Sequence, residues 1–271
     1  MDTAPKPLKT LIAQLGNAVV AYSGGTDSSY LLAVCLDVLG PDRVLALTAD
    51  SPLTPRREMA EARDLARALG ARHIVLPCDD LHQPDIVANR PDRCYHCKFR
   101  RFEELWQVAR REGLDHLLHG ENADDAADYR PGAQAAEELG VRAPLREAGL
   151  TKAQIRDLAR ARGLPNWNRP ANACLASRFP YGTALSAQGL ARVEAAEEAI
   201  HALWGPGPFR VRDHFPVARI EAPSDEIERL SQETLRAPVV QALRELGYSY
   251  VTLDLVGYRM GSMNHGLEPT S

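Results

Sequence analysis

The chain has 271 residues, of which 45% are apolar and 25% are charged, a composition typical of globular proteins. Its formal net charge of −4 argues against a broad basic surface that would hold nucleic acid through its phosphates. No apolar run is long enough to span a membrane, and residues 1–10 lack the apolar segment of a secretory signal, so we expect a cytoplasmic protein.

Strand and helix patterns alternate along the first part of the chain. A short amphipathic helix at 8–15 precedes apolar segments of strand length at 18–22, 44–48, 73–76 and 114–119, with helical patterns at 28–39, 55–69 and 100–112 between them. Such alternation predicts a parallel sheet covered by helices on both faces. Ligands of these sheets bind at the carboxyl ends of the strands.

The pattern changes near residue 170, where residues 166–183 are rich in Pro, Asn and aromatic residues without a clear period. The remaining signals are a helix at 186–204, strands at 209–212 and 217–221, helices at 224–233 and 238–246, and a strand at 250–255. We therefore predict an α/β domain over residues 1–168 and a smaller C-terminal α+β domain over residues 169–271.

A polar, glycine-containing loop follows the first apolar strand. Its two glycines allow a sharp turn and a close approach of the backbone to a ligand, and the following helix offers a positive N-terminal end. Three serines add hydroxyl donors. Asp27 would repel phosphates unless a cation intervenes, which suggests Mg²⁺ binding or helix capping. The expected ATP-phosphate loop consists of Ser23, Gly24, Gly25, Thr26, Asp27, Ser28 and Ser29; no Walker motif is present.

Five cysteines, an odd number, argue against a disulfide framework. Cys35 and Cys78 lie in apolar segments, where buried cysteine behaves as a small hydrophobic residue. Cys94 and Cys97 form a C-x-x-C pair in what we expect to be a polar loop. This spacing suits a metal ion or cluster iron, although an incidental pair or a redox dithiol also fits.

Cys174 lies far along the chain, near Arg178, which would stabilise its thiolate. Three thiolates of Cys94, Cys97 and Cys174 would leave one iron of a cubane cluster open. A zinc site with His96 or water as the fourth ligand fits the same residue types. The residues alone leave these alternatives open.

Residues 23–29 resemble the PP-loop of ATP pyrophosphatases, which holds the pyrophosphate end of ATP while a substrate is adenylated. Thr48, at the end of the second strand, resembles their adenine-contacting segment. Over nearly its whole length the chain resembles the LarE family of ATP-dependent sulfur transferases. The most specific matching segments are residues 121–125, 128–132, 173–182, 253–255 and 257–264.

The resemblance implies that ATP, with Mg²⁺, adenylates a carboxylate of pyridinium-3,5-biscarboxylate mononucleotide, a step in making the nickel-pincer nucleotide cofactor. A sulfur nucleophile then displaces AMP and leaves a thiocarboxylate. In this family the sulfur comes from a [4Fe-4S] cluster on three cysteines or from one sacrificed cysteine, at the position of Cys174. The presence of Cys94 and Cys97 favours the cluster, with Cys174 as the sacrificial alternative.

Further site residues are expected with the resemblance. Arg210 and Arg212 alternate on a predicted strand, so their side chains share one face and suit a phosphate. Arg178 joins Cys174 and Asp27 as a catalytic candidate, and Asp124 is expected to position ATP or Mg²⁺. The expected substrate-binding residues are Lys98, Arg210, Arg212, Glu198, Glu221 and Arg259.

Other functions remain open at this stage. A PP-loop tRNA thiolase also combines this loop with three cysteines, but the acidic net charge disfavours RNA binding. An amide-forming PP-loop synthetase would need no cysteines, and a non-catalytic nucleotide-binding regulator would release no pyrophosphate. We expect a small-molecule substrate and no nucleic acid, and the resemblance implies a homo-oligomer.

Overall fold

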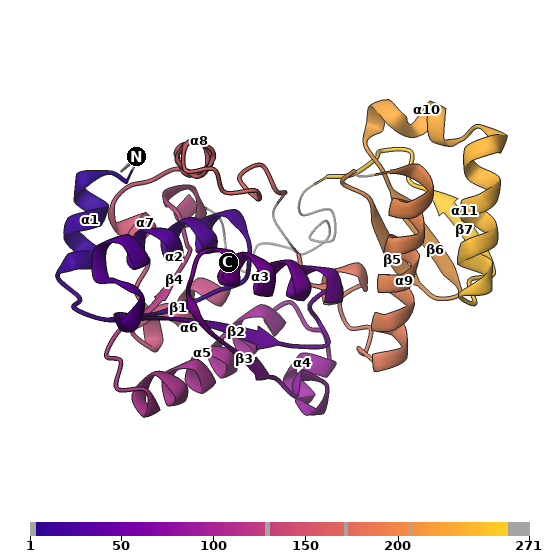
Figure 1. Ribbon diagram of the computed structural model, residues 1–271. Helices are drawn as coiled ribbons and strands as arrows, with labels where there is room; N and C mark the ends of the chain where they lie inside the picture. The colour runs from indigo at the N-terminus through magenta and orange to yellow at the C-terminus, as the bar shows by residue number, and fades with distance from the viewer. Residues whose placement is uncertain (1–3, 128–130, 171–172, 206, 260–271) are drawn as a thin grey trace. The chain divides into compact units, whose positions relative to one another are not determined.

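A computed structural model describes residues 4–127, 131–170, 173–205 and 207–259 of the chain (Figure 1). The matching segments 128–130 and 260–264 lie outside these described residues. The chain divides into two compact units, one formed by Met1–Asp80 with Asp92–Asn172 and the other by Leu81–Pro91 with Ala173–Ser271.

The first unit contains a four-stranded parallel sheet in the order β3-β2-β1-β4. Its strands are β1 (Ala18–Ala21), β2 (Val44–Asp50), β3 (Arg72–Pro77) and β4 (Leu117–His119). The helices α2 (Thr26–Leu39), α3 (Arg56–Ala68) and α5 (Arg93–Arg111) connect successive strands. The expected α/β class is therefore confirmed. Because β1 lies between β2 and β4, the loop after β1 sits where the strand order reverses, the usual place for a ligand.

Two apolar cores lie on opposite faces of this sheet. One core joins α2, α3, α1 (Lys6–Ala13), α7 (Pro144–Glu147) and α8 (Lys152–Ala161) to side chains of β1 and β2, including Val20 and Ala46. The other joins α5 and α6 (Pro131–Glu138) to Val19 and Leu45 on the opposite face. Figure 1 shows the two helical layers on either side of the strands.

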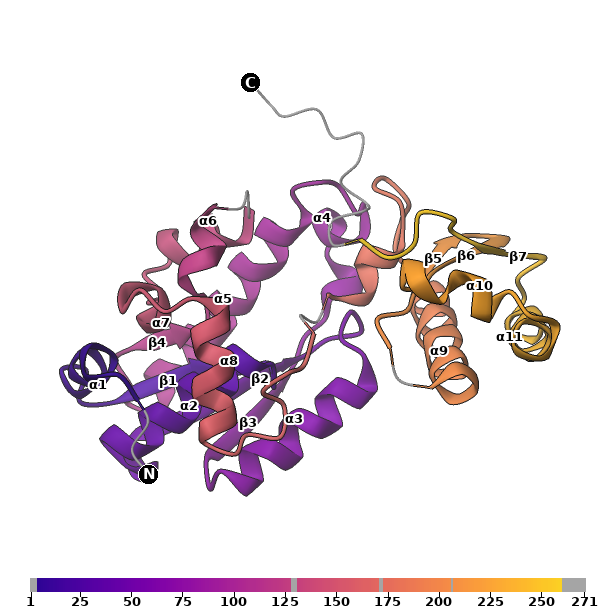
Figure 2. The same cartoon turned by 90° about the horizontal axis from the view of Figure 1, so that it is seen from above.

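The second unit contains a small mixed sheet. Strands β5 (Arg210–His214) and β6 (Val217–Glu221) are antiparallel, and β7 (Tyr250–Leu253) runs parallel to β6. Helices α9 (Ala187–Trp204) and α11 (Glu233–Glu245) pack on one face of this sheet, and the short α10 (Ile227–Leu230) joins the same core (Figure 2). This matches the expected C-terminal α+β order.

Residues 81–91, with α4 (Pro84–Val87), belong to the second unit although they interrupt the first in sequence. Leu185 N donates to Val87 O at 2.9 Å, and Asn89 Nδ2 donates to Pro180 O at 3.0 Å. The remaining short elements are the 3₁₀ turns η1 (Pro41–Arg43), η2 (Asp80–His82), η3 (Ala123–Ala127), η4 (Leu175–Arg178) and η5 (Ser224–Glu226).

Two sequence-based expectations were wrong in detail. The C-x-x-C pair does not lie in a loop, because α5 begins at Arg93 instead of near residue 100. Its first turns are so polar that they carry little apolar periodicity. Helix α11 begins at Glu233 and continues through Pro238 instead of starting there. Within the described part of the chain, no helix has the length and apolar content needed to cross a membrane.

Candidate active site

The backbone of the loop after β1 can be formed only with glycine at its second position. Gly24 has φ +74°, and a Cβ added to it would lie 2.7 Å from the Cβ of Ala62 on α3. Gly25 is the N-cap of α2, and Ser29 N donates the first helical hydrogen bond to Gly25 O at 3.0 Å. The N–H groups of residues 26–28 precede that bond, so they have no acceptor within the helix and form an anion-binding end.

The hydroxyl groups of the loop mainly shape the loop itself. Ser23 Oγ accepts from Gly25 N at 3.3 Å and lies 3.1 Å from Ser28 Oγ. Ser28 Oγ in turn lies 3.2 Å from Gly25 O, to which it donates. These contacts fold the loop into a tight cradle. Phosphate contacts therefore fall first to the backbone N–H groups, with the hydroxyls behind them.

Asn166, which follows α8 and lies outside the motif, forms hydrogen bonds with the same loop. Its Nδ2 donates to Gly24 O at 2.8 Å and to Ser29 Oγ at 2.9 Å, and its backbone O accepts from Thr26 Oγ1 at 2.7 Å. Ser29 is fully buried and Thr26 nearly so. The hydroxyls of these two expected ATP-binding residues are thus directed at Asn166.

Asp27 faces a cation supplied by the protein. Lys152 Nζ lies 2.5 Å from Asp27 Oδ1, and Asn122 Nδ2 donates to Asp27 Oδ2 at 3.1 Å. The backbone N of Lys152 donates to the exposed Asp124 at 2.8 Å. The acid therefore sits at the phosphate end of the loop with a lysine that offsets its charge. Lys152 carried no local sequence signal, and Asn122 was marked only as part of the matching segment 121–125.

Thr48, in the second half of β2, contacts the residue after β1 and a side chain near the start of β3. Its Oγ1 donates to Tyr22 O at 2.7 Å and lies 2.8 Å from His73 Nε2. On the other side of β1, a Cβ added to Gly120 would lie 2.8 Å from Ser28 N, so the loop after β4 closes tightly on the start of α2. These contacts fix the edge at which ATP is expected. Adenine contact by Thr48 stays a prediction.

A buried polar cluster lies at the end of β4. His119 Nε2 is 3.5 Å from Glu121 Oε2, and Arg146 Nη1 is 2.9 Å from Glu121 Oε1. Burial, and then the nearby charges of Lys98 and Arg146, lower the pKa of His119 to about 3. His119 is therefore neutral at physiological pH. Lys98, expected to bind substrate, comes from α5 and brings its positive charge close to this cluster.

The C-x-x-C thiols lie one turn apart on α5. Cys94 is exposed, Cys97 is buried, and Arg93 Nη2 lies 3.6 Å from Cys94 Sγ. Two thiolates at this spacing fit a shared metal or cluster iron. Cys35 and Cys78 differ, as expected for core residues: burial raises the pKa of Cys35, and burial with the Glu104 carboxylate raises that of Cys78 to about 12.

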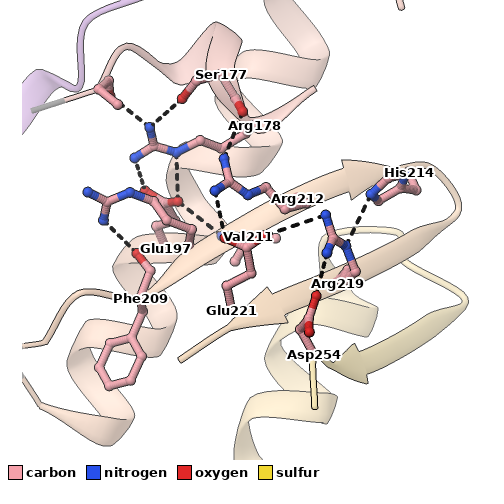
Figure 3. Close-up of polar contacts among 12 residues, drawn as sticks. Ser177, Arg178, Glu197, Phe209, Val211, Arg212, His214, Arg219, Glu221 and Asp254 are labelled. Atoms are coloured by element: carbon pink, nitrogen blue, oxygen red, sulfur yellow. Dashed lines mark hydrogen bonds and ion pairs between the residues drawn. The ribbon is translucent and has the colours of Figure 1, made fainter. Parts of the chain in front are cut away.

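Cys174 belongs to the second unit, where it is half-buried at the start of η4. The buried Arg178 donates from Nη1 to Ala173 O at 2.7 Å and to Cys174 O at 3.2 Å. Its Nε and Nη2 each lie 2.9 Å from the Glu197 carboxylate (Figure 3). Arg178 thus holds the backbone at Cys174, and Glu197, which the sequence did not single out, balances its charge.

The two expected arginines of β5 differ in their surroundings. Arg212 Nη2 donates to the fully buried Glu221 at 2.6 Å, and Arg212 Nη1 donates to Ser177 O at 2.8 Å (Figure 3). Arg210 donates to Phe209 O and lies over the Tyr258 ring, and within the described residues it forms no ion pair. Burial, and then the charge of Arg178, lower the pKa of Arg210. An anionic ligand would compensate this guanidinium.

The remaining expected residues lie at the surface. Glu198 and Arg259 are exposed, and it is the neighbouring Glu197 that enters the buried arginine network. Among the residues that the structure describes, no group of three or more His, Cys, Asp and Glu side chains gathers closely enough to hold a metal ion. The three candidate cluster ligands are divided between the units, two in the first and one in the second.

Comparison with known proteins agrees with this picture. Residues 8–86 match the family model described as NAD synthase, a span that covers the ATP-phosphate loop. The chain is 32% identical over 155 residues to the NH(3)-dependent NAD(+) synthetase of Hyperthermus butylicus, covering 54% of each chain. An uncharacterized protein of Synechocystis sp. is 39% identical over 98% of this chain and 99% of its own length.

The similarity that identifies the family also extends end to end. The pyridinium-3,5-bisthiocarboxylic acid mononucleotide synthase of Lactiplantibacillus plantarum is 41% identical over 270 residues, which cover 98% of this chain and 97% of that protein. The loop geometry, the full-length similarity and the thiols in both units lead to one assignment. The chain belongs to the pyridinium-3,5-bisthiocarboxylic acid mononucleotide synthase (LarE) family of PP-loop, ATP-dependent sulfur transferases.

Proposed function

We propose that this enzyme converts pyridinium-3,5-biscarboxylate mononucleotide to its thiocarboxylate form for nickel-pincer nucleotide cofactor synthesis. The observation that carries the proposal is the 41% identity, over nearly the whole chain, to a synthase named for the bisthiocarboxylic product. The PP-loop geometry of the first unit and the arginines of the second support a reaction between ATP and an anionic mononucleotide.

In the first half-reaction a substrate carboxylate oxygen attacks the α-phosphorus of ATP, and pyrophosphate leaves. Backbone N–H groups at the start of α2 and the Lys152 ammonium neutralise the pyrophosphate charge as it develops. Asp27 would hold Mg²⁺, which would neutralise further phosphate charge. The product is an acyl adenylate, whose AMP is a much better leaving group than carboxylate oxygen.

In the second half-reaction a sulfur nucleophile attacks the acyl carbon and AMP leaves. Cys94, Cys97 and Cys174 would hold a [4Fe-4S] cluster, which when bound supplies an exchangeable sulfide. Arg93 Nη2, 3.6 Å from Cys94 Sγ, places a positive charge beside the first pair. Arg178, by bonding the carbonyls of residues 173 and 174, orients the third ligand.

The alternative source of sulfur is Cys174 itself. Its thiolate would form a thioester with the substrate and release AMP. Loss of the Cα proton to a base and cleavage of the Cβ–Sγ bond would then free the thiocarboxylate and leave dehydroalanine. The half-buried position of Cys174 next to a fixed backbone is compatible with this chemistry.

Arg210 is the candidate for the substrate phosphate, because it forms no ion pair among the described side chains and burial lowers its pKa, although the charge of Glu197 acts in the opposite direction. On the same strand, Arg212 is paired with Glu221. The roles of Lys98, Glu198 and Arg259, the cytoplasmic location and a homo-oligomeric state stay predictions.

The test is anaerobic turnover of the purified chain with ATP, Mg²⁺ and the biscarboxylate mononucleotide, before and after reconstitution with iron and sulfide. Pyrophosphate, AMP and a product heavier by the replacement of oxygen with sulfur are expected. The intact protein mass separates the sulfur sources, because only the sacrificial route removes H₂S, about 34 Da, from the chain. Pyrophosphate release without a thiolated product would overturn the proposal.

A further inference from the structure

Asn166 makes three hydrogen bonds to residues of the phosphate loop, although it lies 137 to 142 positions after them in the sequence. We propose that Asn166 is a positioning residue that holds the Gly24–Gly25 peptide in its phosphate-binding orientation and thereby sets the affinity for the pyrophosphate end of ATP. This inference deepens the ATP-binding part of the proposed function and rests on it.

The orientation of the Asn166 side chain follows from the chemistry of its neighbours. Gly24 O can only accept a hydrogen bond, so the atom 2.8 Å from it must be Nδ2, the donor. The second N–H of the same group reaches Ser29 Oγ at 2.9 Å. Oδ1 is buried without a hydrogen-bond partner in the described part of the chain. A buried acceptor without a partner is unfavourable, so the two N–H donors are the useful part of this side chain.

The peptide that Asn166 holds is unusually free to rotate. A peptide flip changes ψ of the residue before the plane and φ of the residue after it, and here both are glycine. Gly24 at φ +74° and Gly25 at φ −72° have no Cβ to oppose such a rotation. Because C=O and N–H of a trans peptide point in opposite directions, holding Gly24 O also fixes the direction of Gly25 N–H, which donates to Ser23 Oγ at 3.3 Å. A flipped peptide would break that contact and put a carbonyl oxygen in place of the N–H beside the N-terminal end of α2.

The third contact joins Asn166 to Thr26, the first residue of α2. Thr26 Oγ1 donates to the backbone O of Asn166 at 2.7 Å, so the chain at residue 166 is held whichever side chain it carries. A substitution at position 166 should therefore remove the two amide contacts and leave this one in place. The local fold is then preserved, but the Gly24–Gly25 peptide loses the hydrogen bond that fixes its orientation.

The experiment compares Asn166→Ala and Asn166→Asp with Asn168→Ala and Asn168→Asp in the full chain. Asn168 is exposed, so its variants match the change in size and charge without touching the loop. Calorimetry would measure the Kd of ATP and of inorganic pyrophosphate with Mg²⁺, and the Kd of AMP, which lacks the pyrophosphate end. Asn166→Asp removes both donors and places an acceptor against Gly24 O.

We expect Asn166→Ala to weaken ATP and pyrophosphate binding by about tenfold or more, the effect of losing one or two hydrogen bonds, with AMP binding within about twofold of wild type. Asn166→Asp should weaken the binding of ATP and pyrophosphate further. The Asn168 variants should bind both ligands as the wild type does. Unchanged ATP binding in both Asn166 variants, or an equal loss for ATP and AMP, would overturn the inference. If one Asn166 variant fails to fold, the other decides.

The same data keep this inference separate from the proposed function. Wild-type chain that binds neither ATP nor pyrophosphate would overturn the phosphate-loop assignment and the inference together. Wild-type chain that binds both but makes no thiocarboxylate would overturn the proposed function alone, and the comparison at position 166 would still decide the inference.

Discussion

Replacing Glu197 with alanine should destabilise the C-terminal unit far more than the same change at the adjacent Glu198. Glu197 accepts two hydrogen bonds from Arg178 at 2.9 Å and one from Val211 N at 3.0 Å. The Arg178 side chain is only 3% exposed, so removing Glu197 takes the carboxylate of this ion pair away from a buried charge. Removing one partner of a buried ion pair costs about 3–5 kcal/mol. Glu198 is exposed, and its loss should change stability by about 0.5 kcal/mol or less.

Urea unfolding of the full chain, with hydrogen exchange of the β5 amides by mass spectrometry, would measure this difference. The Val211 amide should lose protection in Glu197→Ala, because its acceptor is the missing carboxylate. Glu197→Gln, which keeps acceptor atoms but not the charge, should fall between wild type and Glu197→Ala. Equal stability of the Glu197→Ala and Glu198→Ala variants would refute the view that Arg178 depends on Glu197.

Other variants test the chemistry and the buried histidine. Asp27→Asn should reduce pyrophosphate release by at least about a hundredfold, since it removes a Mg²⁺ ligand, and normal adenylation would refute that role. Cys174→Ser should abolish the thiolated product but retain pyrophosphate release. Cys94→Ala should prevent iron uptake and stop a cluster-dependent reaction, whereas a sacrificial Cys174 would still give one product per chain. The depressed pKa of His119, about 3, means that the unfolded chain binds more protons below pH 6.5. Stability should therefore fall by about 2 kcal/mol from pH 6.5 to 5 through this group, and His119→Gln should flatten that part of the urea-denaturation profile.

The sequence predicted well what consecutive residues build. The strand, glycine turn and helix start that make the phosphate loop lie within residues 18–39, and apolar periodicity recovered all four strands of the parallel sheet. It failed at the C-x-x-C pair, because the first turns of α5 are stabilised by context and carry few apolar residues.

Contacts between residues far apart in the sequence were not predicted. Lys152, which is 125 residues from Asp27, carried no signal, and the matching segment that contains Asn122 did not show that its side chain contacts Asp27. Glu197 was missed for a different reason. On α9 it is followed directly by a second glutamate, but only Glu197 falls at helical spacing from the buried Val193 and Ile200, a signal that the sequence analysis did not use. Which face of the helix a glutamate occupies therefore predicts its burial better than its residue type does.

The expected binding of ATP phosphates depends on residues outside the seven-residue motif as well as on the motif itself. Within the motif, Thr26 and Ser29 direct their hydroxyls at Asn166, and Ser23 and Ser28 contact each other. Asp27, the acid of the motif, is paired with Lys152, which lies outside the motif. Partners outside the motif therefore fix the positions of several of its polar groups. A chain with the same seven residues but without partners such as Asn166 and Lys152 should bind the pyrophosphate group less tightly.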